Sequence, residues 1–93
     1  MELKQLRTFV AVTKHGSVTD AAIGLALAPS SVSEQIRTLE RSLGVPLFTR
    51  TARGMRLTAA GQRMLSWAPR LLDQADQARA EVKIGRASCR ERV

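Results

Sequence analysis

The sequence predicts a mostly α-helical fold, in which three short helices and a two-stranded hairpin precede one long helix. Three observations support this prediction. Apolar residues recur at helical spacing through most of the chain, two short alternating segments flank Arg53-Gly54, and a heptad pattern occupies the last third. With 93 residues the chain can hold one modest core, which must be largely aliphatic because only Phe9, Phe48 and Trp67 are aromatic.

Apolar spacing and a capping pattern mark the first two helices. The first is expected from about Leu3 to Lys14, followed by Gly16 as a stop signal. The residues that recur at helical spacing are Leu3, Leu6, Phe9, Val10 and Thr13. Ser17 and Asp20 then form a capping box, so a short second helix is expected to follow and to run through Leu25.

A third helix is predicted after the break at Ala28-Pro29, because proline disrupts a helix interior but suits a first helical position. One stripe of this helix is apolar and should be buried: Val32, Ile36, Leu39 and Leu43. The opposite face is polar and should be exposed: Ser30, Ser33, Glu34, Arg37 and Arg41. Gly44 ends the helix. Two helices with a tight break between them form a helix-turn-helix pattern, which many helical bundles share.

A basic hairpin follows directly. Residues 47–50 and 55–57 alternate around Arg53-Gly54, as the two strands of a hairpin do. A basic hairpin placed after the second helix of a helix-turn-helix is typical of a wing. Residues 1–58 are therefore predicted to form a winged helix-turn-helix domain.

The last helix is predicted from Ala59 to about Val82, with Thr58 as its cap and with a kink near Leu65-Ser66 caused by Pro69. Its apolar residues form a heptad seam: Met64, Ala68, Leu71, Leu72, Ala75, Ala78 and Val82. The first part should pack on the chain's own domain. Beyond Leu72 little of that domain remains to cover the seam, so residues 59–83 are predicted to link two copies in a homodimer.

Charge is unevenly distributed along the chain, whose net charge is +7. Between Glu40 and Asp73 there is no acidic residue, whereas arginine recurs at 41, 50, 53, 56, 63 and 70. Self-repulsion in such a segment opposes folding, and a polyanionic partner such as double-stranded DNA would offset it. The alternative is a solvated basic face without a ligand.

Four segments resemble the N-terminal domain of LysR-type transcriptional regulators: residues 17–22, 30–40, 43–50 and 56–61. The pieces Leu-Gly-x-x-Leu-Phe-x-Arg and Leu-Thr-x-Ala-Gly are the most specific. This resemblance implies a homodimer whose recognition helices enter successive major grooves, and a small-molecule effector bound by a separate C-terminal domain that this chain lacks. No cofactor is expected, and the single cysteine, Cys89, which cannot form an internal disulfide, fits a cytoplasmic location.

The residues expected to contact DNA are Ser30, Ser31, Ser33, Glu34, Arg37, Arg50 and Arg53. Two positions depart from the family pattern, because Ala28-Pro29 replaces the usual Ser-Gln and Glu34 replaces a frequent Arg. Glu34 repels phosphate but can accept a hydrogen bond from a cytosine amino group. Arg37 could instead pair with Glu34 or Glu40, and Arg50 could be a buried anchor of the wing.

Residues 84–93 continue neither the heptad nor the family pattern. They resemble a translated sequencing adapter, so they are predicted to be a non-native or disordered tail, or at most a fraying extension of the helix. The alternative is a natural basic tail that touches phosphate.

Other function classes fit the sequence less well. Enzymes need convergent catalytic groups, and the single histidine, His15, has no cysteine or carboxylate near it in sequence. No apolar run approaches the roughly 20 residues of a membrane span, and the N-terminus shows no signal-peptide pattern. Two alternatives remain: a winged helix of another class, such as molybdate-responsive regulators, and a dimerisation module that binds no DNA.

Overall fold

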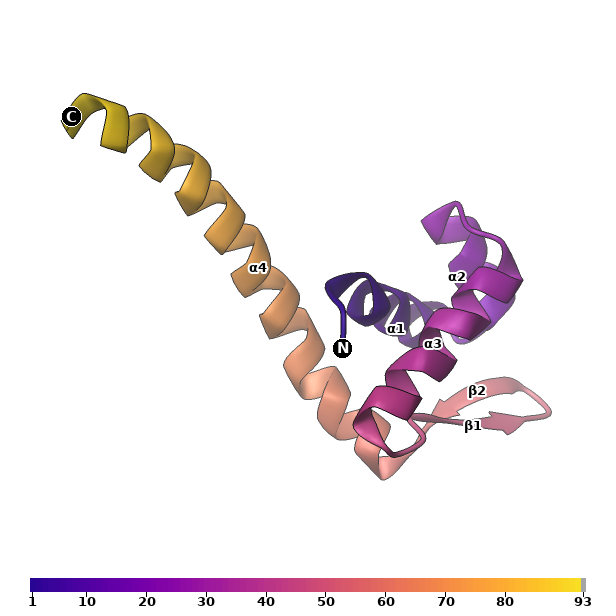
Figure 1. The fold of residues 1–93 in the computed structure, drawn as a ribbon. Helices are drawn as coiled ribbons and strands as arrows, with labels where there is room; N and C mark the ends of the chain where they lie inside the picture. Colours follow the sequence, from indigo (N-terminus) through magenta and orange to yellow (C-terminus); the bar gives the residue numbers. More distant parts are fainter. Residues whose placement is uncertain (93) are drawn as a thin grey trace.

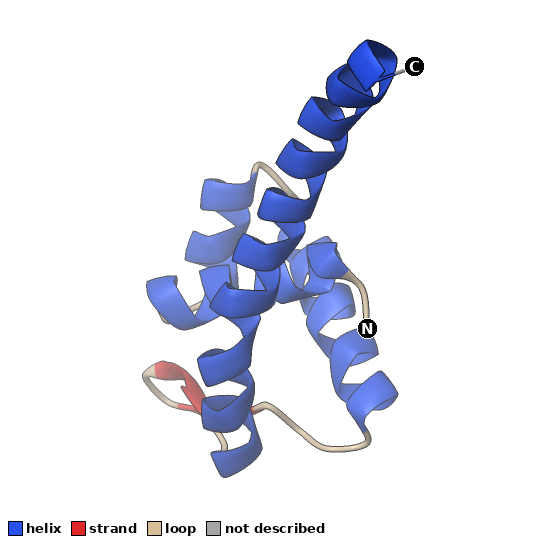
Figure 2. Ribbon diagram, turned by 90° about the vertical axis from the view of Figure 1, so that its left-hand side faces the viewer, coloured by secondary structure: helices blue, strands red, loops and turns tan. Residues whose placement is uncertain are grey.

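Four helices and one antiparallel two-stranded sheet make up the computed structural model, which describes the backbone of residues 1–92 and the side chains of residues 1–83 (Figure 1). The elements in chain order are α1 (Leu3–His15), α2 (Val18–Leu25), α3 (Pro29–Leu43), β1 (Phe48–Thr51), β2 (Gly54–Leu57) and α4 (Ala59–Arg92). Helices α1 to α3 and the sheet form a small domain, and α4 extends away from it (Figures 1 and 2). The predicted winged helix-turn-helix with a long final helix is confirmed.

The short helices begin and end at the predicted signals. The Ser17 hydroxyl accepts a hydrogen bond from the Asp20 amide at 3.1 Å, which caps α2. Gly44 ends α3 in the left-handed conformation, with φ 76°, where its missing Cβ avoids strain. Helix α3 begins at Pro29 and its N-cap residue, Ala28, makes no side-chain hydrogen bond. The amide groups at the start of α3 therefore lack the usual hydroxyl cap.

The core lies where α1, α2 and α3 meet β1 and the first turns of α4. The predicted stripe on α3 is buried at Val32, Ile36 and Leu39 and partly buried at Leu43. Phe9 of α1 and Phe48 of β1 pack with their ring centroids 5.3 Å apart. These two aromatic rings join the helical layer to the base of the wing.

The wing is a short hairpin whose register pairs Phe48 with Leu57 and Thr51 with Gly54. Its strands lie within one residue of the predicted segments. A Cβ atom on Gly54 would lie 2.7 Å from the carbonyl oxygen of Gly16, and φ at Gly54 is 127°. Only glycine fits here without strain, because the wing backbone approaches the α1–α2 turn so closely. The wing is thus held against the helices.

Helix α4 starts at a tightly packed corner. The Thr58 hydroxyl donates to the Pro46 carbonyl at 2.7 Å and accepts from the Gly61 amide at 3.0 Å, which confirms the predicted cap. A Cβ atom on Gly61 would overlap the carbonyl oxygen of Leu47. The helix and the loop before β1 are therefore in direct backbone contact.

The far end of α4 differs from the prediction. The helix continues through Pro69 and ends at Arg92 rather than near Val82. Residues 83–92 contain no proline and a single glycine, so no strong stop signal ends the helix at Val82. The backbone of residues 84–92 is helical, which matches the alternative that the tail extends the helix. Val93 lies outside the described residues. Whether the tail is native to the protein stays a prediction.

Candidate nucleic-acid interface

The polar face of α3 is the centre of the candidate interface. Ser30, Ser31, Glu34 and Arg37 are exposed and Ser33 is half-buried, on the side of the helix opposite the buried stripe. Ser30, Ser31 and Glu34 line a surface hollow that α3 shares with the start of the chain. The division between buried and exposed faces predicted from the sequence is confirmed.

Glu34 contacts two arginines of its own helix. Its Oε2 lies 3.6 Å from Nη1 of Arg37, and its Oε1 lies 3.3 Å from Nη2 of Arg41. Arg41 also donates to the Thr38 hydroxyl at 3.2 Å. The alternative for Arg37, an ion pair with Glu34, is therefore present in the structure. It leaves Arg37 exposed and does not prevent it from contacting DNA.

Glu40 does not pair with Arg37 but connects α3 to the wing. Its Oε2 accepts hydrogen bonds from the backbone amides of Leu47, at 2.7 Å, and Phe48, at 3.2 Å. A single carboxylate thereby fixes the start of β1 relative to the recognition helix. Sequence reasoning missed this role, although an acid one turn before Gly44 and just ahead of an acid-free segment was a signal for it.

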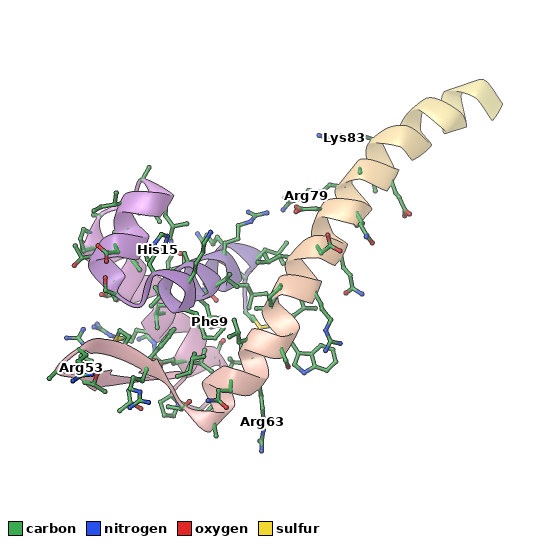
Figure 3. All side chains as sticks on the ribbon, turned by 180° about the vertical axis from the view of Figure 1, so that it is seen from behind. Phe9, His15, Arg53, Arg63, Arg79 and Lys83 are labelled. Carbon is green, nitrogen blue, oxygen red and sulfur yellow. The ribbon has the colours of Figure 1, made fainter. Side chains whose placement is uncertain are left out.

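The wing carries the second part of the interface. Arg50, Arg53 and Arg56 are exposed, and among the described side chains none of them forms an ion pair. The alternative of Arg50 as a buried anchor is therefore wrong, because the strand places its side chain in solvent. Arg53 lies at the tip of the wing, away from the helices (Figure 3). These arginines are available to a polyanion.

A groove joins the two parts. Ser33 of α3 and Arg50 of β1 both line a hollow of about 410 Å³, together with Ser17 and Thr19 at the start of α2. A second hollow between α3 and β1 is lined by Arg37 and again by Ser33 and Arg50. The structure thus brings Ser33, Arg37 and Arg50 together, while Arg53 extends beyond them.

The predicted dimer residues on α4 fall into two groups. Ala68 is 0% exposed and belongs to the core, which corrects its assignment, because no surface remains for a second chain. Met64, Leu71 and Leu72 pack partly against the same core. Ala78 and Val82 are exposed, and Ala75 is half-buried. Trp67, which was not predicted, is 55% exposed, with the Arg70 guanidinium 5.0 Å from the centre of its ring.

Two further kinds of site were sought on the described part of the chain, a metal site and a membrane-spanning helix. Among residues whose side chains the structure shows, no three histidines, cysteines or acids gather as a metal site would require. None of the helices within residues 1–92 has the length and apolar character needed to cross a membrane. The basic groove and wing are the features that need a functional explanation.

A helix-turn-helix whose second helix presents polar side chains beside a basic wing defines a DNA-binding domain. Residues 3–62 match the family model described as "Bacterial regulatory helix-turn-helix protein, lysR family". The chain belongs to the LysR family, and this part of it is the family's helix-turn-helix DNA-binding domain. The resemblance predicted from the sequence is confirmed.

Curated relatives are regulators several times longer than this chain. The transcriptional regulator YofA of Bacillus subtilis is 42% identical over 86 residues, covering 92% of this chain and 30% of YofA. PtxR of Pseudomonas aeruginosa is 45% identical over 83 residues, covering 89% of this chain and 27% of PtxR. The chain therefore spans less than a third of these relatives.

Solved structures share the fold. A complex of the CbnR DNA-binding domain with DNA has a TM-score of 0.87 and 36% identity, covering 91% of this chain and 98% of that one. A complex of the BenM DNA-binding domain with benA site 1 DNA has a TM-score of 0.83 and 40% identity, covering 89% of this chain and 96% of that one. Both neighbours were solved with DNA bound.

Proposed function

We propose that this domain docks on double-stranded DNA with α3 in the major groove and the wing against the adjacent backbone. The observation that supports this most strongly is the shared groove, in which Ser33 of the recognition helix and Arg50 of the wing line one hollow. Recognition helices of helix-turn-helix proteins contact base edges with their N-terminal residues. Ser33 and Arg37 are then the groove-facing residues, and Ser30, Ser31 and Glu34 lie on the flank.

The wing supplies affinity that does not depend on sequence. Arg50, Arg53 and Arg56 carry no acidic partner among the described side chains, so their charge is free to neutralise phosphates. Phosphate contacts position a protein on the duplex, whereas base contacts give it specificity. Arg53, at the tip, reaches farthest and is placed for a phosphate or for the minor groove.

The outer part of α4 is proposed to pair with a second copy of the chain. Trp67, Ala78 and Val82 lie on one side of the helix and are exposed in the single chain, with Val82 at 60%. An exposed apolar stripe of this spacing on a long helix fits a coiled-coil partner. A two-fold dimer would present two recognition helices to half-sites about 34 Å apart, or a multiple of that distance.

The whole protein is proposed to be a bacterial transcription regulator that acts in the cytoplasm, where its DNA partner lies. A small-molecule effector enters this proposal only through a separate C-terminal domain, as the family resemblance implies. The proposed role of this chain is non-enzymatic and uses no cofactor.

Selection of bound duplexes from a random pool tests the docking. The proposal predicts an enriched inverted repeat, because a two-fold dimer reads two equivalent half-sites. Arg53→Ala should weaken binding to all duplexes and lower the salt slope by about 0.9 for each phosphate that is no longer neutralised. Lys83→Ala, on α4 far from the wing (Figure 3), is the charge-matched control. An unenriched pool, or equally weakened binding in both variants, would contradict the proposed docking.

A further inference from the structure

Among the described side chains, the arginines of the recognition helix and those of the wing differ in whether they have an acidic partner. On α3 the two exposed arginines next to the proposed DNA face share one carboxylate, Glu34. On the wing, Arg50 and Arg53 have no acidic partner within the described side chains. Placing an acid on a helix that meets a polyanion costs affinity, since Glu34 repels phosphate. We therefore looked for a role of Glu34 that offsets this loss of affinity.

The geometry of the three side chains indicates that role. Residues 34, 37 and 41 follow one another at i, i+3 and i+7, so they lie on one face of α3. Each carboxylate oxygen of Glu34 faces a different guanidinium, with Oε1 toward Arg41 and Oε2 toward Arg37. The carboxylate thereby lies between two positive charges that would otherwise repel each other.

The two arginines are not held equally. Arg41 has two partners, Glu34 at 3.3 Å and the Thr38 hydroxyl at 3.2 Å. Arg37 has only the longer contact with Glu34, at 3.6 Å, and it also lines the hollow that contains Ser33 and Arg50. Arg37 can therefore turn toward DNA at small cost, whereas Arg41 stays on the helix with Glu34 and Thr38.

We propose that Glu34 is a positioning residue, which holds Arg41 away from the phosphates and leaves Arg37, its more weakly held partner, free to turn toward the groove shared with the wing. This inference rests on the proposed docking of α3 on DNA. Its consequence is that α3 contributes few phosphate contacts, so that affinity without specificity comes mainly from the wing. Glu34 then raises the ratio between specific and random binding, and it does so without touching a base.

The first test uses Glu34→Gln, which keeps the shape of the side chain and removes its charge. Releasing Arg41 should strengthen binding to random duplex about two- to fivefold at low salt, and should steepen the salt slope by about 0.9 for one additional neutralised phosphate. Binding to the selected site should strengthen less, so the specificity ratio should fall. Glu81→Gln, with the same charge change on the exposed outer part of α4, should change neither quantity.

A double-mutant cycle separates positioning from the two simpler roles. In an Arg41→Ala background, Glu34→Gln should no longer steepen the salt slope, because the arginine that it releases is gone. If the slope and affinity still rise equally in that background, Glu34 acts only by repelling phosphate and the proposal is overturned. If Glu34→Gln instead changes base preference at one position of each half-site, Glu34 reads a base, which also overturns it.

A measurement on the free protein distinguishes failure of this inference from failure of the docking. Glu34→Gln should shift the side-chain NMR signals of Arg37 and Arg41 without DNA present, while those of Arg53 stay unchanged. Unshifted signals would show that the contacts with Glu34 are absent in solution. If the signals shift but the wild-type chain binds no duplex, the proposed docking fails and the Glu34 contacts remain.

Discussion

The inner and outer parts of α4 carry the same apolar repeat but lie in different surroundings. In residues 59–72 the helix is packed on the domain, with Gly61 against the Leu47 carbonyl and Ala68 fully buried. In residues 73–83 every side chain except Ala75 is exposed. A heptad pattern therefore predicts that a helix has a partner, but not whether that partner is the same chain or another one.

The strongest test of the inner part is Gly61→Ala. The new Cβ would overlap a backbone oxygen, which cannot rotate away as a side chain does, so α4 must move off the loop before β1. We expect the free energy of unfolding to fall by about 3 kcal/mol, measured by urea denaturation. Gln62→Ala, at the exposed neighbouring position, is the control and should change stability little. If both variants were equally stable, the contact between Gly61 and the Leu47 carbonyl would have room for a Cβ atom, contrary to the structure.

A matched pair of substitutions compares the two parts directly. Ala68→Leu inserts three carbon atoms into a fully buried site and should cost about 1–3 kcal/mol. Ala78→Leu makes the same change at an exposed site, so it should leave the domain's stability unchanged and should favour dimerisation. Thermal unfolding at several protein concentrations measures both effects. Similar destabilisation in the two variants would mean that both positions are buried within one chain.

The outer part alone is tested by Val82→Glu. Val82 is 60% exposed, so the substitution should not disturb the chain's own core, but a charge within the proposed seam should weaken the dimer. Sedimentation equilibrium should show a dissociation constant raised about tenfold, the equivalent of about 1.4 kcal/mol. Ala80→Glu adds the same charge on the opposite side of the helix and should have no such effect. Leu71→Glu would not separate dimerisation from folding, because Leu71 also packs against the core.

The smallest expected effect concerns the ion pair between α1 and α4. Asp76 lies 3.8 Å from Arg7 and 3.7 Å from Arg79, and all three side chains are largely exposed. Asp76→Asn should therefore cost less than about 1 kcal/mol, and this destabilisation should disappear at high salt. Denaturation at two salt concentrations, with Glu81→Gln as the control, measures it. A larger, salt-independent destabilisation would show that Asp76 helps to set the direction of α4.

Local signals predicted the domain well, because they depend on neighbours in sequence. The Ser17 cap, the start of α3 at Pro29 and the paired strands of the wing each follow from residues a few positions apart. The hydrogen bonds of Glu40 with the wing could not be predicted in the same way, since its partners lie seven and eight residues away across a turn.

The errors on α4 have a common cause. Ala68 fits the heptad that predicts a dimer, yet it faces the chain's own core because the folded domain lies on that side. Trp67 does not belong to the predicted heptad seam, yet it is an exposed apolar residue because the domain does not cover it. In both cases the surroundings of the side chain depend on where a separate part of the chain lies in space, which a periodic pattern does not contain.

The attachment of α4 to the domain determines how far a small movement is amplified. One hydroxyl joins the loop before β1 to the first turn of α4, and α4 then continues for 34 residues. Because residues 59–72 are packed on the domain, the free arm is residues 73–92. At 1.5 Å per residue this arm is about 30 Å long, so a tilt of one degree where it leaves the domain displaces its far end by about 0.5 Å. Conversely, an ångström of movement at that end turns the wing and the recognition helix by only about two degrees. The orientation of the domain therefore changes little when the far end of α4 moves.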